Sequence, residues 1–165
     1  MIKYLYILSF IFISSCASGP ASLSQPPSTV EILEAKKANS PVAVSGIHGV
    51  RNSANGVDIQ ITYKNISDRI IKYVTFHVQF KNAVNDVVAG EISGQKITSL
   101  RATGPIKPNA VRWGAYNGWS AAFYHSNAKS VHISKVEVEY VNEKSKEKVV
   151  VIGLPGTFGV IAGKR

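Results

Sequence analysis

The segment Val57-Asp58-Ile59-Gln60-Ile61-Thr62-Tyr63-Lys64 alternates apolar and polar side chains over its whole length. Successive side chains of a β-strand point to opposite faces, so this pattern predicts a strand with one buried face and one solvated face. The Asn55-Gly56 pair just before it is typical of a tight turn, because both residues readily adopt positive φ. The residues expected to face the core are Val57, Ile59, Ile61 and Tyr63.

Similar β-rich runs lie on both sides of this segment, separated by turn residues. In one of them, 131–141, the apolar side chains change from odd to even positions. A β-bulge near Ser134-Lys135 would restore a single inward face there. In 95–103, Ile97 and Leu100 are expected to point inward. The further strands are expected at 42–50, 70–81, 87–89, 95–103, 110–119, 131–141 and 148–152.

About seven or eight short strands, without a long helix or an internal repeat, predict an all-β fold with an antiparallel β-sandwich architecture. A small barrel is the alternative, because strand periodicity does not establish whether a sheet closes. The domain is expected to cover residues 41–165. It would contain no disulfide, since Cys16 is the only cysteine of the chain.

The first residues combine one positive charge, at Lys3, with the apolar run 5–13. This run is shorter than the roughly 20 residues of a membrane-spanning helix, and the layout is that of a secretory signal. Ile13-Ser14-Ser15-Cys16, at its end, resembles the bacterial lipobox. The resemblance implies that the signal, residues 1–15, is removed and that Cys16 carries diacylglycerol and an acylated amino terminus. An ordinary signal peptide with a chance cysteine is the alternative.

Residues 16–40, which begin with this cysteine, are expected to form a tether. The stretch 17–29 is rich in proline, serine and other small residues, and it offers no apolar face to bury. Residues 30–38 are compatible with a short helix, with Thr29 as its N-cap. At up to about 3.3 Å per residue, the tether would let the domain stand tens of ångströms from the membrane.

The lipobox also implies an address, the bacterial cell envelope. In Gram-negative sorting an aspartate after the cysteine retains a lipoprotein in the inner membrane, so Ala17 implies the outer membrane, facing the periplasm. The formal net charge is +9, from 19 Lys and Arg against 10 Asp and Glu. Such a charge favours anionic surfaces, such as phospholipid head groups or acidic glycan. Nucleic acid suits the charge but not the compartment, so no nucleic-acid partner is expected.

A second resemblance covers most of the domain, from residue 57 to residue 152. An Asn65-Ile66-Ser67 turn precedes a strand rich in lysine and aromatic residues, and the proline-containing loop 104–109 follows later. The run 131–140 then ends its inward aliphatic residues in a tyrosine. These features resemble small immunoglobulin- or fibronectin-like bacterial envelope domains of unknown function. The resemblance implies an immunoglobulin-like sandwich and supplies no catalytic residues.

The residue types of common active sites do not converge in this sequence. The histidines are His48, His77, His125 and His132, and none has another within metal-ligand spacing. No serine occupies a Gly-x-Ser-x-Gly elbow, and no glycine-rich phosphate loop is present. We therefore expect no metal, no cofactor and no enzymatic activity.

Aromatic residues gather in the segment 112–124, which holds both tryptophans of the chain. Aromatic faces beside Asn and Arg are typical of protein and carbohydrate recognition, although a β-sandwich core also needs large aromatic residues. Trp113 is expected in the core. The candidate partner-binding residues are Arg112, Tyr116, Trp119 and Tyr124. A second candidate is the outward face of 70–81, with Lys72, Tyr73, Thr75, His77 and Gln79, which could accept a partner strand if it lay at a sheet edge.

The sequence as a whole favours a non-catalytic, lipid-anchored envelope module that presents a β-sandwich to a protein or glycan partner. Attachment to the membrane would raise its local concentration, so the contact need not be strong. One alternative is a structural or assembly component of an envelope machine, such as a secretion or pilus apparatus. A periplasmic hydrolase is a further alternative. No sequence signature indicates an oligomeric state.

Overall fold

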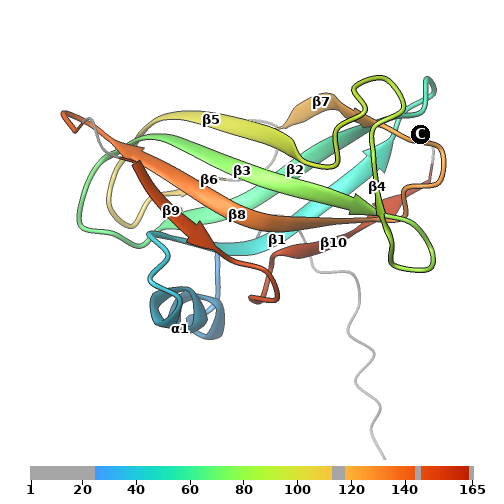
Figure 1. Ribbon diagram of the computed structural model, residues 1–165. Helices are drawn as coiled ribbons and strands as arrows, with labels where there is room; N and C mark the ends of the chain where they lie inside the picture. Colours follow the sequence, from blue (N-terminus) through green and yellow to red (C-terminus); the bar gives the residue numbers. More distant parts are fainter. Residues whose placement is uncertain (1–24, 113–117, 144–145, 164–165) are drawn as a thin grey trace, which may run out of the picture.

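The structure, a computed structural model, describes residues 25–112, 118–143 and 146–163 (Figure 1). Within these ranges the chain is mostly β-strand with one short helix, which confirms the predicted β-rich fold. The predicted signal, Cys16, Trp113 and Tyr116 lie outside the described residues.

The described residues form one helix and ten strands, more strands than the sequence pattern predicted. The helix α1 spans Thr29–Lys37 and precedes all the strands. The strands are β1 Val42–Arg51, β2 Gly56–Asn65, β3 Ile71–Lys81, β4 Val87–Val88, β5 Thr98–Ile106, β6 Val111–Arg112, β7 Trp119–Tyr124, β8 Ser130–Tyr140, β9 Lys146–Val150 and β10 Phe158–Ala162.

The strands pair in the order β4-β3-β8-β10-β1-β2-β6, with β5 also on β3, β7 on β2 and β9 on β8. β1 and β10 run parallel, so the sheet is mixed and the expectation of a purely antiparallel arrangement is wrong for this pair. β10 itself is an unpredicted strand, because Gly153, Gly156 and Gly159 make its surroundings look like a loop. A Cβ on Gly159 would collide with the carbonyl oxygen of Ile47 in β1, so glycine is what allows this close approach.

Two layers of strands enclose one hydrophobic core. Figure 1 shows β3, β5 and β8 in front of β1 and β2. The ring of Tyr63 from β2 lies edge-on to that of Phe76 from β3, with centroids 5.0 Å apart. The rings of Phe80 from β3 and Phe123 from β7 stack with centroids 3.8 Å apart. β10 links the layers, because it pairs with β8 through Phe158–Val160 and with β1 through its last two residues.

The strand predicted from the alternating segment 57–64 is confirmed as the centre of β2. Its four expected core residues, Val57, Ile59, Ile61 and Tyr63, are all fully buried. The predicted bulge is also present, because Ser134 is the extra residue of β8 where the register on β3 shifts between His77 and Val78. The Ser134 hydroxyl donates to the carbonyl oxygen of His77 at 2.9 Å, which holds the bulge in place.

Three local predictions are wrong. β5 begins at Thr98 instead of residue 95, so Ile97 is exposed, whereas Leu100 is buried as expected. The predicted loop at 104–109 starts inside β5, and the fully buried Ile106 ends that strand. The bounds of β5 could not be predicted from local pattern, because they are set by its pairing with β3, which is a long-range interaction.

The helix α1 follows the predicted range closely, but its N-cap is Ser28 instead of Thr29. Ser28 and Glu31 form a capping box, in which each side chain accepts a hydrogen bond from the other residue's backbone N–H. The helix contacts β1 and buries Ala35, while Val30 and Leu33 point to solvent. No helix in the described part of the chain is long and apolar enough to cross a membrane.

The two buried tyrosines give the first prediction. The Tyr63 hydroxyl is buried and has no hydrogen-bond partner among the described residues, whereas the Tyr140 hydroxyl donates to Glu147 Oε2 at 2.9 Å. Tyr63→Phe should therefore leave the free energy of unfolding unchanged or raise it, and Tyr140→Phe should lower it by about 1 kcal/mol. Urea unfolding of both variants measures this difference. Equal losses in the two variants would show that the Tyr63 hydroxyl has a partner.

Candidate functional site

β3 is a central strand, so it has no free edge to which a partner strand could add, and its outer face points to solvent. It pairs along its length with β5 on one side and with β8 on the other. The alternative that placed this strand at a sheet edge is therefore wrong. Its outward residues begin with Lys72 and Tyr73 and continue with Thr75, His77 and Gln79.

Two cationic side chains lie close to the Tyr73 ring on this outer face. The guanidinium carbon of Arg101, from β5, is 3.6 Å from the centroid of the Tyr73 ring, and Lys72 Nζ is 5.1 Å from it. Both cations are attracted to the electron-rich ring face. Glu139, from β8, pairs with Lys72 Nζ at 3.1 Å and lies 3.9 Å from Arg101 Nη2. The side chains of Lys72 and Arg101 stay 49% and 52% exposed, so solutes can reach their donors.

A groove of about 600 Å³ begins at Tyr73 and runs across the start of β3. We call it the β3 groove. Its lining residues come from the start of β3, the end of β5 and the turn after β8, and they are Lys72, Tyr73, Thr103, Gly104, Pro105, Val141, Asn142 and Glu143.

A register irregularity in β5 shapes one wall of the β3 groove. Ile71 pairs with Ile106 and Tyr73 with Thr103, so two β5 residues, Gly104 and Pro105, lie opposite Lys72 alone. A Cβ on Gly104 would collide with the carbonyl oxygen of Ile71. The wall can therefore lie this close to β3 only with glycine at position 104.

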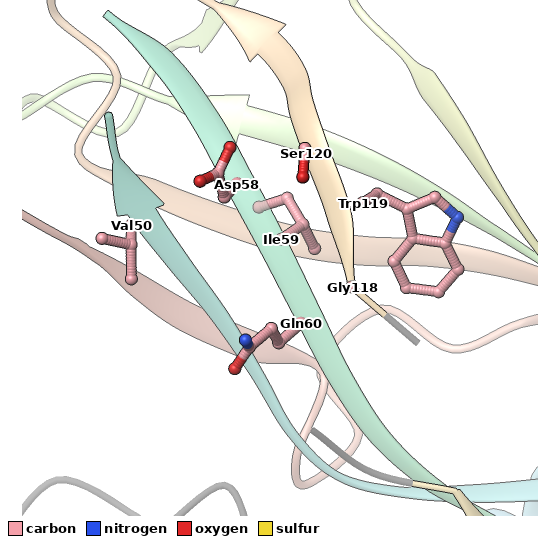
Figure 2. A pocket seen from close by; sticks show the side chains of 7 residues that line it. All are labelled: Val50, Asp58, Ile59, Gln60, Gly118, Trp119 and Ser120. Carbon is pink, nitrogen blue, oxygen red and sulfur yellow. The ribbon is translucent and has the colours of Figure 1, made fainter. Parts of the chain in front are cut away.

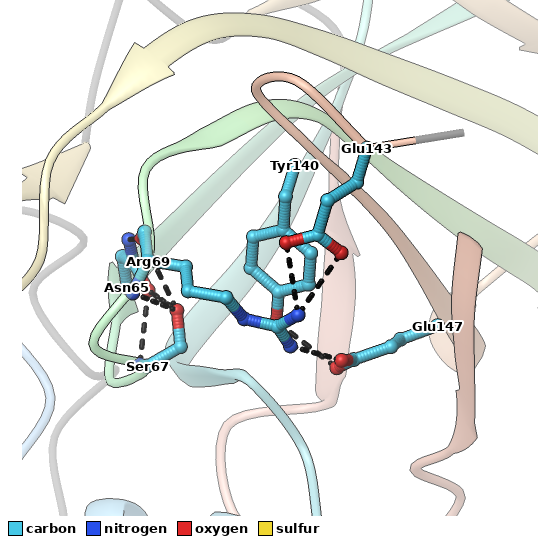
Figure 3. A network of polar contacts seen from close by, with 6 residues as sticks. All are labelled: Asn65, Ser67, Arg69, Tyr140, Glu143 and Glu147. Atoms are coloured by element: carbon cyan, nitrogen blue, oxygen red, sulfur yellow. Dashed lines mark hydrogen bonds and ion pairs between the residues drawn. The ribbon is translucent and has the colours of Figure 1, made fainter. Parts of the chain in front are cut away.

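An ionic network centred on Arg69 holds the opposite wall (Figure 3). Arg69 Nη1 donates to both carboxylate oxygens of Glu143, at 3.1 and 3.0 Å, and Nη2 donates to Glu147. The guanidinium carbon also lies 3.6 Å from the centroid of the Tyr140 ring. The hydrogen bond with Glu147 is the main cause that raises the pKa of Arg69, and burial is the main cause that raises the pKa of Tyr140. Because Glu143 lines the β3 groove, the network fixes that lining residue in place.

The Asn65-Ile66-Ser67 turn positions Arg69 for this network. Asn65 Oδ1 accepts hydrogen bonds from the Ser67 backbone N–H at 3.0 Å and from its hydroxyl at 2.7 Å. Asn65 Nδ2 donates to the Arg69 carbonyl oxygen at 2.8 Å and to that of Ile106 at 3.0 Å. Side-chain hydrogen bonds of this kind stabilise tight turns. The turn therefore connects Arg69 to the end of β5, which forms the other wall of the groove.

A second charge cluster lies farther along the same outer face, around Glu137. Its Oε1 is 2.9 Å from Lys135 Nζ, 3.2 Å from His77 Nε2 and 3.6 Å from Lys148 Nζ. The hydrogen bond from Lys135 is the main cause that lowers the pKa of Glu137. Burial, followed by the charge of Lys135, lowers the pKa of His77. The cluster keeps a carboxylate ionised among cations and leaves His77 neutral at neutral pH.

The sequence-predicted partner-binding residues do not form one cluster. Tyr116 lies outside the described residues, and the other three are spread along β2. Each sits opposite a different β2 residue: Arg112 opposite Tyr63, Trp119 opposite Ile59 and Tyr124 opposite Gly56. The first and last of these partners are about 20 Å apart along the strand.

Two of these residues also connect β6 and β7 to β5. Arg112 Nη2 donates to the Pro105 carbonyl oxygen at 3.1 Å, and Trp119 Nε1 donates to that of Arg101 at 3.2 Å. The Trp119 ring lies edge-on to Phe76, with centroids 6.2 Å apart. Both side chains therefore join the two layers. Tyr124, opposite Gly56, lies on the outward-facing side of β2.

A cavity of about 220 Å³ lies over β2 and β7 (Figure 2). Figure 2 shows Asp58, Gln60 and Ser120 around it, while the Trp119 ring points away from Asp58 and Gln60. The Asp58 carboxylate accepts a hydrogen bond from the Ala121 backbone N–H at 2.7 Å. Ala121 has φ of 48°, in the left-handed region that costs energy for a residue with a Cβ. Asp58 thus supports a strained bulge in β7, which explains this polar residue without a ligand.

The histidines lie on different elements: His48 in β1, His77 in β3, His125 after β7 and His132 in β8. Among residues 25–112, 118–143 and 146–163, no group of three or more His, Cys, Asp or Glu side chains is placed to hold a metal ion. The outward face of β3 was a candidate from sequence. The Arg101 contact and the groove were not, because β5 and the β8–β9 turn are distant in sequence from Tyr73.

Comparisons with known proteins identified no relative of this chain. No known family, no curated protein and no solved structure matches this chain.

Two partly buried histidines should make the free energy of unfolding depend on pH. Burial lowers the pKa of both His77 and His132, so below about pH 6.5 the unfolded chain binds more protons than the folded one. The free energy of unfolding should therefore fall as the pH is lowered from 7 to about 5. The double variant His77→Gln/His132→Gln should show a flatter dependence in urea unfolding at several pH values. His125→Gln serves as the single-histidine control, and an unchanged slope in the double variant would refute this origin.

Proposed function

We propose that this protein is a non-catalytic binding module of the bacterial cell envelope. A lipid on Cys16 holds it at a membrane, and the β3 groove receives a protein or glycan partner. The observation that carries the proposal is the groove itself, which is lined by an aromatic ring, Tyr73, and a half-exposed cation, Lys72. A second half-exposed cation, Arg101, lies against the same ring just outside the lining.

The chemistry of the groove suits recognition. The Tyr73 ring offers a flat face that buries much area at low entropic cost. Lys72 and Arg101 offer hydrogen-bond donors to carboxylates, hydroxyls or carbonyl groups. The walls are held by the close contact of Gly104 on β3 and by the Arg69 network, so little ordering is needed on binding.

The lipid anchor rests on the lipobox-like Ile13-Ser14-Ser15-Cys16 and on the proline- and serine-rich stretch that follows it. Attachment to a membrane surface raises the local concentration of the domain. A groove of modest affinity can then still be occupied. Because the residue after the cysteine is alanine, Ala17, we place the protein in the outer membrane, facing the periplasm.

We further propose that the β-rich domain is an immunoglobulin-like sandwich. Its two facing layers, its single core and its short strands support this assignment. The parallel pairing of β1 with β10 departs from the simple antiparallel scheme expected from sequence.

Acylation of Cys16 can be tested directly. Cys16→Ser removes the thiol that would accept diacylglycerol, so incorporation of labelled palmitate into the protein should be abolished. The matched control is Ser15→Ala, which keeps both the cysteine and a small residue before it. Labelling of Cys16→Ser at the level of the parent protein would refute the lipid anchor.

The groove can be tested by cross-linking the full-length lipidated protein in envelope fractions and identifying what is recovered with it. The double variant Tyr73→Ala/Arg101→Ala should lose the recovered partner, because it removes the aromatic face and one of its cations. Tyr124→Ala, on the other layer, is the matched control and should keep the partner. If Tyr124→Ala lost the partner while the double variant kept it, the contact would lie at the aromatic segment 112–124 and not at the groove.

A further inference from the structure

Four large apolar side chains form an exposed stripe along β9 and β10. We call them the apolar stripe: Val150, Ile152, Phe158 and Val160, which are 69%, 64%, 55% and 62% exposed. Single exposed apolar residues are common, but a contiguous group of large ones marks a surface that contacts a protein or a membrane.

The pairing of β9 and β10 with β8 makes the stripe continuous. Both strands pair with β8. Val150 of β9 lies opposite Lys135 of β8, and Phe158 of β10 lies opposite His132 of β8. Val160 follows on the same face, opposite Ser130. Phe158 also packs edge-on to the His132 ring, with centroids 4.6 Å apart. Ile152 lies in the turn between the two strands.

Lysines surround the apolar stripe. Lys135 is the direct cross-strand neighbour of Val150, and Lys148 lies two residues before Val150 on the same face of β9. Lys81 lies in the row that continues through Ser130 to Val160. The nearby acidic residue Glu137 is already paired with Lys135 and Lys148. Apolar side chains within a cationic rim are complementary to an anionic lipid surface.

The stripe lies beside the point where the tether joins the domain. The Ser45 hydroxyl donates to the carbonyl oxygen of Gln25, the first described residue, at 2.8 Å. Gly156, in the turn of the stripe, packs on Val44 and Ser45, where a Cβ would collide with the Val44 carbonyl oxygen. Gln25 follows Cys16 by only nine residues, which reach at most about 30 Å. A lipid on Cys16 would therefore keep this side of the domain close to the bilayer.

Helix α1 adds to the same side of the molecule. Figure 1 shows α1 and the turn between β9 and β10 below the sheets, and both contact β1. The helix exposes two apolar side chains, Val30 and Leu33, and carries Lys36 and Lys37 in its last turn.

We propose that the apolar stripe docks the domain onto the anionic phospholipid surface of the membrane that holds its lipid anchor. This inference rests on the proposed anchor at Cys16. The stripe inserts its four side chains among the head groups, and Lys81, Lys135 and Lys148 pair with lipid phosphates. A membrane suits this surface better than a protein partner, because the short tether already holds the stripe beside it and the rim is cationic.

The apolar stripe and the β3 groove lie at opposite ends of β8. The stripe lies beside the start of β8, at Ser130, whereas the groove lies beside its end, near Glu139 and Val141. About nine residues of extended strand, or roughly 30 Å, separate these positions. The docked domain would therefore hold the groove at a fixed distance from the point of contact.

The docking can be tested with the full-length lipidated protein in vesicles of phosphatidylcholine and phosphatidylglycerol. An environment-sensitive dye is placed at Phe158→Cys and, as a second site, at Val160→Cys, since Cys16 is consumed by its lipid. Ile92→Cys, an exposed position in the turn after β4 and next to Glu91, whose backbone N–H donates to the Tyr124 carbonyl oxygen, is the control position. Lipids carrying a nitroxide near the head group should quench the dye at 158 and 160 several-fold more than at 92. Omission of phosphatidylglycerol should weaken this quenching.

Two matched charge-reversal variants test whether the lysine rim is needed for docking. Lys81→Glu, at the rim, should reduce the quenching at 158, whereas Lys107→Glu, in the loop between β5 and β6, should leave it unchanged. Equal quenching at 158 and 92, or a protein that floats with vesicles without quenching at 158 and 160, would overturn the docking alone. Dye at 158 shielded equally with and without lipid would overturn it in favour of a protein partner or a second copy. A protein that fails to float with vesicles would refute the anchor and, with it, the docking.

Discussion

The packing of β3 against β2 is the interaction on which the rest of the structure depends. Tyr63 and Phe76 meet in the centre of the core, and each lies on a strand whose side chains mostly alternate between two faces. Once these inward faces meet, the opposite faces must point to solvent. The outward position of Tyr73 and His77 follows from that single constraint.

The two surfaces proposed to act lie on the outer face of the same sheet and are complementary in character. The β3 groove is shaped by tight backbone packing at Gly104 and by the Arg69 network, so its walls are held in place. The apolar stripe has few polar groups and a lysine rim, so the contacts proposed for it depend on apolar area and charge rather than on individual hydrogen bonds. One surface can set the orientation of the domain while the other selects the partner.

Sequence pattern predicted the parts of the fold in which local alternation and burial agree. The strand at 57–64 and the bulge at Ser134 are both visible as a regular period or as a break in one. β10 was not visible in this way, because Gly159 serves a close approach to β1 instead of a turn. The site followed the same rule: Tyr73 was recognised as outward-facing, but its contact with Arg101 joins residues of different strands. No local pattern reports such a contact.

The sequence by itself determined which residues are buried in a regularly alternating strand such as β2, because hydrophobicity and the two-residue period of a strand are local properties. It also determined the net positive charge and the single cysteine. Only the tertiary structure decided that β3 is central, that β10 runs parallel to β1, and that lysines from β3, β8 and β9 surround an exposed apolar stripe. These features depend on which strands pair, and pairing is settled by the packing of the whole core rather than by any one segment.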